Sequence, residues 1–293
     1  MTHPKILAAI GQISQDKAVL ARALEVAGAA RAELHIIHVL DLPGDASKMD
    51  DVTSFLGQVA LAERNRLEQA MKELNAAPSD ATIHIKLGAH ALTLIDFCNE
   101  MHPDLIVMRA HQREKISERL LGSTTDRVIA AAHVPVLVVK RAPKVPYSRI
   151  VLASDGADHA AQTCQFLINL LPEAKLKLVQ AVQIPPQLKE AMLRIGTGRE
   201  DLISHRNELL IKAQDHLREI AEHGGRRVKT KVIKGEPIKA LSKLCRKSEV
   251  DLLALGQGRS SLISRAFIGS VSRRLLRDAT CDVLIWCPPR TAL

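Results

Sequence analysis

A glycine-rich segment at 256–272 carries the clearest chemical signal in the sequence. It starts with Gly256 and Gly258, and Arg259 follows directly. Glycine lets a backbone approach an anion closely, and an arginine supplies charge-assisted hydrogen-bond donors. These residue types in one loop predict a phosphate-binding site.

The same segment ends in four residues that open an expected helix: Gly269, Ser270, Val271 and Ser272. Free N–H groups and the dipole at a helix N-terminus favour phosphate, and the two serines add hydroxyl donors. An ordinary helix N-cap at Ser270 explains the serine equally well.

Asp155 ends an apolar run and precedes Gly156. A carboxylate at the C-terminal end of a parallel strand faces the ligand crevice of an α/β sheet. There it can accept hydrogen bonds from a ribose or an adenine amino group. Capping of the following helix is the alternative, and on this residue alone the more favoured one.

The remaining reactive residues give weaker signals. His35, His38, His84, His90 and His111 fall near strand ends of the first half, but no His or Cys spacing typical of a metal site joins them. We therefore predict no protein-bound metal, apart from Mg²⁺ that accompanies a nucleotide. No nucleophile–base pair or Gly-Lys-Ser/Thr phosphate loop is visible, so we expect at most slow ATP hydrolysis.

Charge and composition narrow the partners. Residues 1–145 hold 17 basic and 17 acidic residues, so the whole net charge of +9 belongs to the second half. A basic half favours an anionic ligand. Aromatic residues make up 2% of the chain, too few for base-stacking nucleic-acid modules. Five cysteines without C-x-x-C spacing, and no membrane-length apolar stretch, predict a cytoplasmic protein.

The elements that must position these residues occur twice. Residues 104–109 recur at 251–256, and Leu-Gly-Ser at 121–123 recurs as Ile-Gly-Ser at 268–270, both with an offset of 147. The first strand was matched at an offset of 145, which pairs Ile10 with Asp155. We predict two domains, 1–142 and 147–293, joined by a short linker with two prolines.

Each repeat alternates apolar strands with helices, which predicts an open, doubly wound, five-stranded parallel sheet. In the first repeat we expect strands at 5–10, 34–40, 83–87, 105–108 and 134–139, and helices at 15–30, 53–74, 91–99 and 118–132. The closing strands of the two repeats are expected at edges. Exposed edges invite pairing, so we predict that the repeats join through these strands as an internal pseudo-dimer.

These motifs together resemble the universal stress protein family. The likeness rests on a strand ending in Asp, a Gly-x-x-Gly-x9-Gly-Ser/Thr pattern after a later strand, and a closing Val-Pro-Val-Leu-Val-Val strand at 134–139. The tandem arrangement with His111-Gln112 resembles the family's E group. The resemblance covers the whole chain and implies an adenine nucleotide alpha hydrolase-like fold.

The resemblance also implies an adenine-nucleotide site in the second repeat. Asp155 and Val182 match the positions that meet adenine or ribose, and Gly256 matches the first loop glycine. Arg259 stands where the second glycine belongs, with Gly258 beside it. The helix-opening residues match the end of the motif: Gly269, Ser270, Val271 and Ser272.

The first repeat departs further from the family pattern. Ile10 was placed at the Asp position, while Arg109 and Gln112 take both loop-glycine positions. We therefore expect this copy not to bind ATP in the family manner.

Two functions follow as hypotheses. The first is a stress-response protein that binds ATP or a related adenine nucleotide in its second domain. The alternative is a scaffold or a binding module for another small or lipid-like molecule. A protein partner and a homodimer of whole chains remain open, and nucleic-acid binding through 226–231 or 273–277 is disfavoured.

Overall fold

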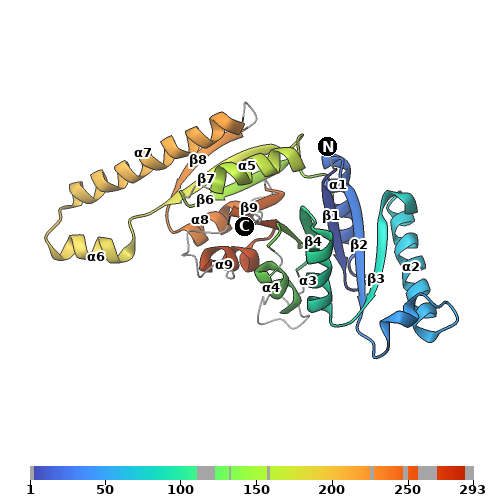
Figure 1. Cartoon of the computed structure of the whole chain (residues 1–293). Helices are drawn as coiled ribbons and strands as arrows, with labels where there is room; N and C mark the ends of the chain where they lie inside the picture. Colours follow the sequence, from blue (N-terminus) through green and yellow to red (C-terminus); the bar gives the residue numbers. More distant parts are fainter. Residues whose placement is uncertain are drawn as a thin grey trace. The chain divides into compact units, whose positions relative to one another are not determined.

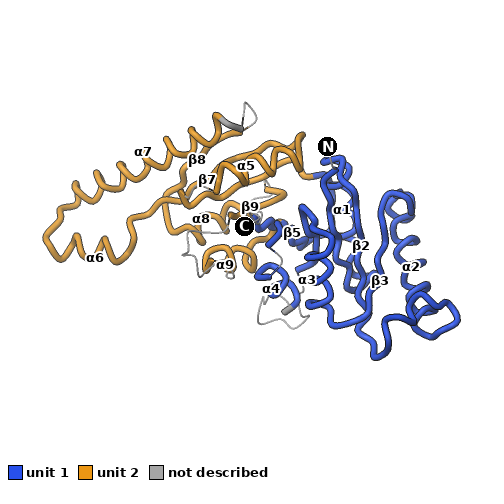
Figure 2. Tube along the Cα trace, in the orientation of Figure 1, with its two compact units in different colours: residues 1–146, 262–267, 282–293 blue, residues 147–261, 268–281 orange. Residues whose placement is uncertain are grey.

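The structure is a computed structural model that divides into two compact units (Figure 2). Unit 1 comprises residues 1–146, 262–267 and 282–293, and unit 2 comprises residues 147–261 and 268–281. The structure describes residues 3–110, 123–131, 133–156, 159–224, 228–246, 250–256 and 269–287.

Unit 1 holds the first repeat's parallel sheet, in the order β3-β2-β1-β4-β5 (Figure 1). Its strands are β1 (Lys5–Ile10), β2 (Glu33–Leu40), β3 (Thr82–Leu87), β4 (Leu105–Arg109) and β5 (Val136–Val139). Its helices are α1 (Lys17–Ala30), α2 (Phe55–Glu73), α3 (His90–Met101) and α4 (Ser123–Ala131), with 3-10 turns η1 (Ala46–Met49) and η2 (Pro78–Asp80).

Unit 2 has parallel strands in the order β9-β6-β7-β8. Its strands are β6 (Arg149–Ser154), β7 (Lys175–Val182), β8 (Val228–Lys234) and β9 (Leu252–Gly256). Its helices are α5 (His159–Leu170), α6 (Pro186–Arg194), α7 (Arg199–Gly224), α8 (Pro237–Arg246) and α9 (Ser270–Asp278). The doubly wound arrangement predicted from the strand–helix alternation is confirmed.

The last strand of the second repeat, β10 (Asp282–Trp286), lies in unit 1 and pairs antiparallel with β5. Val283 stands opposite Val138, and Ile285 stands opposite Val136. All four side chains are fully buried. The predicted pairing of the two closing strands is therefore present, and it removes β5 from the sheet edge.

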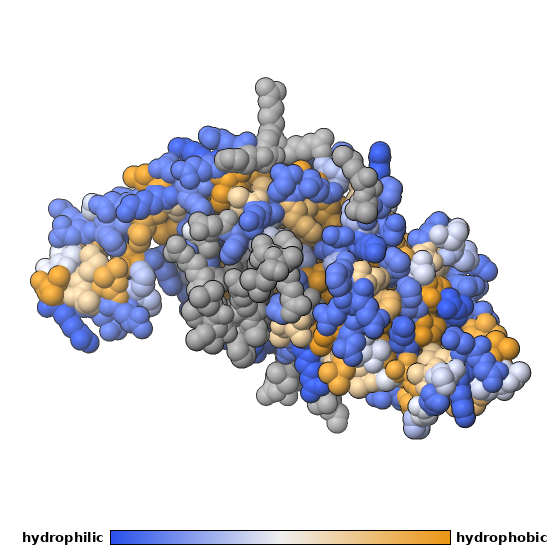
Figure 3. Space-filling view, viewed as in Figure 1, coloured by the Kyte–Doolittle hydropathy of each residue, from blue (hydrophilic) through white to orange (hydrophobic). Residues whose placement is uncertain are grey.

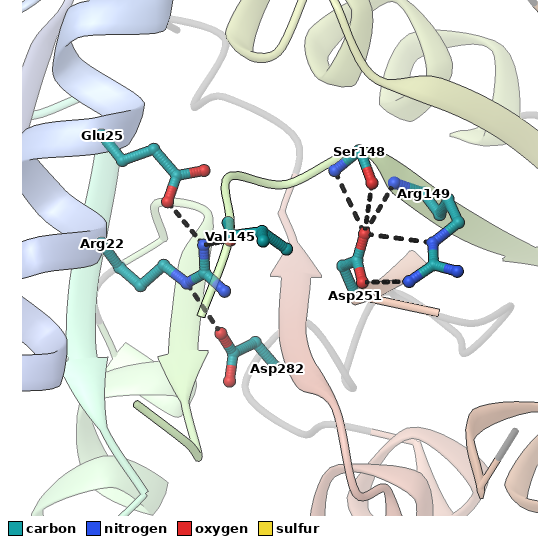
Figure 4. Close-up of polar contacts among 7 residues, drawn as sticks. All are labelled: Arg22, Glu25, Val145, Ser148, Arg149, Asp251 and Asp282. Carbon is teal, nitrogen blue, oxygen red and sulfur yellow. Dashed lines mark hydrogen bonds and ion pairs between the residues drawn. The ribbon is translucent and has the colours of Figure 1, made fainter. Parts of the chain in front are cut away.

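A buried ion pair fixes β10 to unit 1 (Figure 4). Arg22, on α1, places Nε 3.3 Å from the carboxylate of Asp282, and both side chains are almost completely buried. The same guanidinium donates to the carbonyl of Val145 and to Glu25, while the backbone N–H of Lys140 donates to Asp282 at 2.8 Å. Loss of one partner would leave a buried charge, which typically costs about 3–5 kcal/mol.

The repeated aspartates Asp104 and Asp251 have the same structural task. Asp104 accepts from the N–H of Lys5 at 2.7 Å, and Asp251 accepts from the N–H of Arg149 at 3.0 Å. Burial alone would raise the pKa of Asp251, but hydrogen bonds from Arg149 and Ser148 outweigh it and lower that pKa (Figure 4). These carboxylates tie the first strand of each repeat to the fourth.

The strand registers correct one sequence prediction. Ile6 pairs with Leu105 in the first repeat, and Ile150 pairs with Leu252 in the second. Because Leu105 and Leu252 are equivalent, the first strands match at an offset of 144, one residue away from the predicted 145. The counterpart of Asp155 is consequently Gly11. The prediction failed because the short apolar runs of both strands allow a one-residue slip.

The second repeat also carries helical structure that the sequence pattern did not reveal. The short helix α6 buries no residue, and the first half of α7 extends with it past the sheet of unit 2 (Figure 1). Large apolar side chains on α6, on the first half of α7 and between them are exposed to solvent (Figure 3): Leu188, Leu193, Ile195, Ile203 and Ile211.

Candidate functional site

The candidate site lies in unit 2, beyond the C-terminal ends of β6 and β9. β6 pairs with β7 on one side and with β9 on the other. The connections that follow β6 and β9 therefore lead to opposite sides of the sheet. That topological switch point is where open α/β sheets bind ligands.

A cavity of about 300 Å³, here called the unit 2 crevice, occupies this position. Its polar lining combines the end of β6, the start of α5 and the start of α9. The lining residues are Leu152, Ala153, Ser154, Asp155, His159, Ala160, Thr163, Ala181, Pro237, Leu241, Leu255, Gly256, Gly269, Ser270, Val271, Ser272 and Leu275.

The two glycines of the crevice are not required by the fold. Gly269 has φ −56° and ψ 151°, an extended conformation open to any residue, and a Cβ added there would meet no atom of the described residues within 4 Å. A Cβ at Gly256 would meet only Thr163 Oγ1, at 3.9 Å. The backbone at both positions is therefore bare toward the cavity, which allows a ligand to approach closely.

Helix α9 presents free backbone donors to the same cavity. Gly269 is its N-cap and offers no side chain to satisfy them, and the first intrahelical bond runs from the N–H of Arg273 to the carbonyl of Gly269. The N–H groups of Ser270, Val271 and Ser272 precede that bond in the crevice lining. No described residue accepts a hydrogen bond from these three N–H groups. Donors at the positive end of the helix dipole suit an anion.

At the end of β6 the chain turns sharply, which places Asp155 at the mouth of the crevice. Gly156 has φ +85°, which favours glycine, and its N–H donates to Ser154 Oγ at 3.1 Å. On α5, the buried Thr163 donates to the carbonyl of His159 at 2.8 Å. This side of the crevice therefore offers a carboxylate, and it uses its hydroxyl groups locally.

Six of the predicted residues thus line one cavity: Asp155, Gly256, Gly269, Ser270, Val271 and Ser272. Val182 is buried, and its carbonyl accepts from the N–H of Gly235 at 2.9 Å. Its neighbour Ala181 lines the crevice instead. Gly258 and Arg259 lie outside the described residues, as do His111 and Gln112 of the first repeat.

The equivalent place in unit 1 is built differently. Gly11, at the position of Asp155, has no carboxylate; Asp16 supplies one from the N-cap of α1 and accepts from the N–H groups of Gly11 at 2.7 Å and Gln12 at 2.9 Å. Arg109, at the position of Gly256, donates to the other oxygen of Asp16 at 3.3 Å. An internal ion pair occupies the polar end of this cavity.

Sequence reasoning missed Asp16 and Thr163. Asp16 directly precedes the first helix, so the helix-start pattern marks it as an N-cap, but its contact with Arg109 spans 93 residues and leaves no local signal. Thr163 lies inside a helical pattern, as an ordinary buried residue would.

The histidines of the first repeat have structural partners. His35 Nδ1 lies 3.1 Å from His84 Nε2, with the rings stacked, and His38 Nδ1 lies 2.8 Å from the carbonyl of Ile10. Burial and the neighbouring His35 and Lys86 lower the pKa of His84 to about 4. The His84 ring is therefore neutral at physiological pH.

The described residues contain neither a metal-ligand cluster nor a membrane-spanning helix. No three His, Cys, Asp or Glu side chains there group as metal ligands. No helix there is both long and apolar enough to cross a bilayer. All five cysteines are buried and none of them forms a disulfide, and burial raises the pKa of the Cys98 thiol to about 12.

Comparison with known proteins identifies the fold just described. The sequence model of the universal stress protein family matches residues 3–140 and again residues 146–286. The chain belongs to the universal stress protein family. Both repeats are members, which agrees with the duplication read from the sequence.

Individual relatives match either one repeat or the whole chain. Universal stress protein MJ0531 of Methanocaldococcus jannaschii is 27% identical over 150 residues, which are 49% of this chain and 84% of that protein. The structure of a functionally unknown protein, PA1789 from Pseudomonas aeruginosa PAO1, covers 98% of this chain and 93% of its own at 18% identity, with a TM-score of 0.66. That likeness shows a shared tandem fold.

Some related structures were solved with adenine nucleotides. A universal stress protein from Archaeoglobus fulgidus was solved in complex with dAMP; it covers 47% of this chain and 98% of its own, at 19% identity and a TM-score of 0.34.

Proposed function

We propose that this universal stress protein binds an adenine nucleotide, ATP or a close relative, in the unit 2 crevice, and that it acts in the stress response by binding. The observation that carries the proposal is the bare backbone at Gly256 and Gly269 beside the free N–H groups of α9. Neither glycine is needed for the fold, and both leave room for phosphate oxygens.

The position of Asp155 favours a ligand with an adenosine group. Asp155 lines the cavity at the end of β6, while the N–H groups at the start of α9, which would donate to phosphate, line it beyond β9. A carboxylate there can accept from ribose hydroxyls. Mg²⁺ would enter with the nucleotide's phosphates, since the described residues hold no metal cluster.

A binding role fits the described side chains better than catalysis. Ser154 and Thr163 already make local hydrogen bonds with backbone groups. Neither hydroxyl contacts the imidazole ring of a described histidine or a described carboxylate, as a nucleophile would. The five cysteines form no disulfide, which favours a reducing, cytoplasmic setting.

Calorimetric titration with ATP and ADP tests the proposal, with Gly269→Val as the decisive variant. Valine fits the backbone but fills the approach to the α9 donors, so we expect at least about a tenfold loss of affinity. Gly28→Val is the matched control, because Gly28 is exposed on α1 and a Cβ there also meets nothing within 4 Å. Unchanged affinity in Gly269→Val, or no binding below millimolar ATP, contradicts the proposal.

A further inference from the structure

The cavity at the switch point of unit 1, here called the unit 1 crevice, has about the same volume as its counterpart but a different chemistry. It measures about 300 Å³. Six of its thirteen lining residues are aliphatic or thioether. Its charged residues, Asp16 and Arg109, lie at the start of α1 and the end of β4. The lining residues are Ala9, Ile10, Gly11, Gln12, Asp16, Ile37, Val39, His90, Leu94, Met108, Arg109, Thr124 and Thr125.

Arg109 has more hydrogen-bond donors than described partners in this cavity. Within the described part of the chain, its guanidinium makes one hydrogen bond, at 3.3 Å to Asp16, although guanidinium carries five N–H donors. Its side chain is 26% exposed and lines the crevice. A partly buried cation with spare donors in a planar fork is suited to a carboxylate, which it can bind through two parallel hydrogen bonds.

Asp16 excludes the ligand proposed for unit 2. Its carboxylate is 6% exposed and holds the N–H groups of Gly11 and Gln12, the backbone donors at the end of β1. A polyphosphate there would meet this buried negative charge and would lack the carboxylate that Asp155 supplies in unit 2. Asp16 already neutralises Arg109, so each further negative charge on a ligand adds to an excess of negative charge, and a ligand with one charge is favoured over a polyphosphate.

We propose that the unit 1 crevice is a binding site for a compact apolar molecule that carries one carboxylate. The apolar body packs against Ile37, Val39, Leu94 and Met108, and the carboxylate pairs with Arg109. The volume lies at the lower end for small-molecule pockets, which limits the ligand to roughly 10–20 non-hydrogen atoms. The same fold thus holds two crevices for different ligand classes.

Paired probes with one apolar body test the charge requirement. Indole-3-acetate carries the carboxylate and indole-3-ethanol replaces it with a hydroxyl; benzoate and decanoate extend the size range. We expect a carboxylate of this series to bind once per chain, with indole-3-acetate at least about tenfold tighter than indole-3-ethanol. Met108 methyl resonances should shift on binding, which places the probe in the crevice.

Variants separate this site from the rest of the protein. Arg109→Gln should reduce the affinity for indole-3-acetate to that for indole-3-ethanol. Arg66→Gln, a control at an exposed arginine that pairs with Glu63, should leave the affinity for indole-3-acetate unchanged. Gly269→Val should not affect carboxylate binding, so the site stands even if nucleotide binding fails. Equal affinity of acid and alcohol, full binding by Arg109→Gln, or no binding by any carboxylate of the series to folded protein would overturn the proposal.

Discussion

The two crevices of this protein occupy the same place in the same fold, and two of the equivalent residue pairs that differ between them set their polar chemistry. Unit 2 has Asp155 and Gly256 where unit 1 has Gly11 and Arg109. In unit 2 the carboxylate belongs to the strand end and the backbone is bare. In unit 1 the carboxylate belongs to Asp16, at the start of α1. It accepts from the N–H of Gly11 at the end of β1 and forms an ion pair with Arg109. Duplication thus allows one copy to change its ligand chemistry while the sheet around it is kept.

The largest expected effect comes from moving the arginine between units. Gly256→Arg should reduce ATP affinity by about 100-fold, because the side chain would enter the crevice as Arg109 does in unit 1. The fold should tolerate it, since a Cβ there meets only Thr163 Oγ1 at 3.9 Å. Calorimetric titration measures the effect, with Gly28→Arg as the control. A rise in affinity would show that an arginine at this place assists phosphate binding.

Much of this comparison could be predicted from the sequence. The repeat, the parallel sheets and the paired closing strands follow from apolar runs and a fixed offset, which are strong local signals. Gly269, Ser270, Val271 and Ser272 were found because a glycine before a helix has a local meaning. The Asp16–Arg109 pair could not be found, because it depends on the relative positions of α1 and β4. The one-residue register error concealed that Gly11, and not Ile10, replaces Asp155.

A second variant tests whether unit 1 can regain the carboxylate of unit 2. Gly11→Asp should lower the free energy of unfolding by about 1 kcal/mol, because a Cβ at the exposed Gly11 lies 3.5 Å from the carboxylate of the buried Asp16 and a second negative charge would stand close to it. Urea unfolding gives the value. Gly11→Asn, of equal size and without charge, should cost clearly less. Equal losses for the two variants would show that space, and not charge, separates the crevices.

Acid should weaken unit 1 selectively. The pKa of His84 is about 4, below its ordinary value of 6.5, so the unfolded chain binds the proton more readily. The stability that comes from keeping His84 neutral is complete above pH 6.5 and is lost as the pH falls toward 4. We expect about 1 kcal/mol, a value reduced for solvent screening because the ring is partly exposed.

Hydrogen exchange at pH 7 and pH 5 should show this loss in peptides of β2 and β3. His84→Phe should remove the pH dependence. Equal acid sensitivity in β7 and β8 would contradict a cause confined to unit 1.

The smallest effect separates a glycine kept for the fold from one kept for a ligand. Gly156→Ala should cost about 1–2 kcal/mol, because φ is +85° and its Cβ would lie 3.3 Å from Gln180 Nε2. Gly269→Ala should cost less, at most about 0.5 kcal/mol, because the reduced entropy of the unfolded chain partly offsets the loss of a favourable N-cap residue. Thermal unfolding of both variants gives the comparison. A clear loss in Gly269→Ala would mean that the fold requires this glycine after all.

Photolabelling tests most directly whether the two crevices have separate ligands. The intact protein is irradiated with 8-azido-ATP, digested, and the labelled peptides are identified by mass spectrometry. The account predicts label in unit 2 peptides, around the end of β6 and the start of α9, competed by ATP and lost in Gly269→Val. Label around the end of β1 and in β4, or label shared equally between the two units, would contradict it.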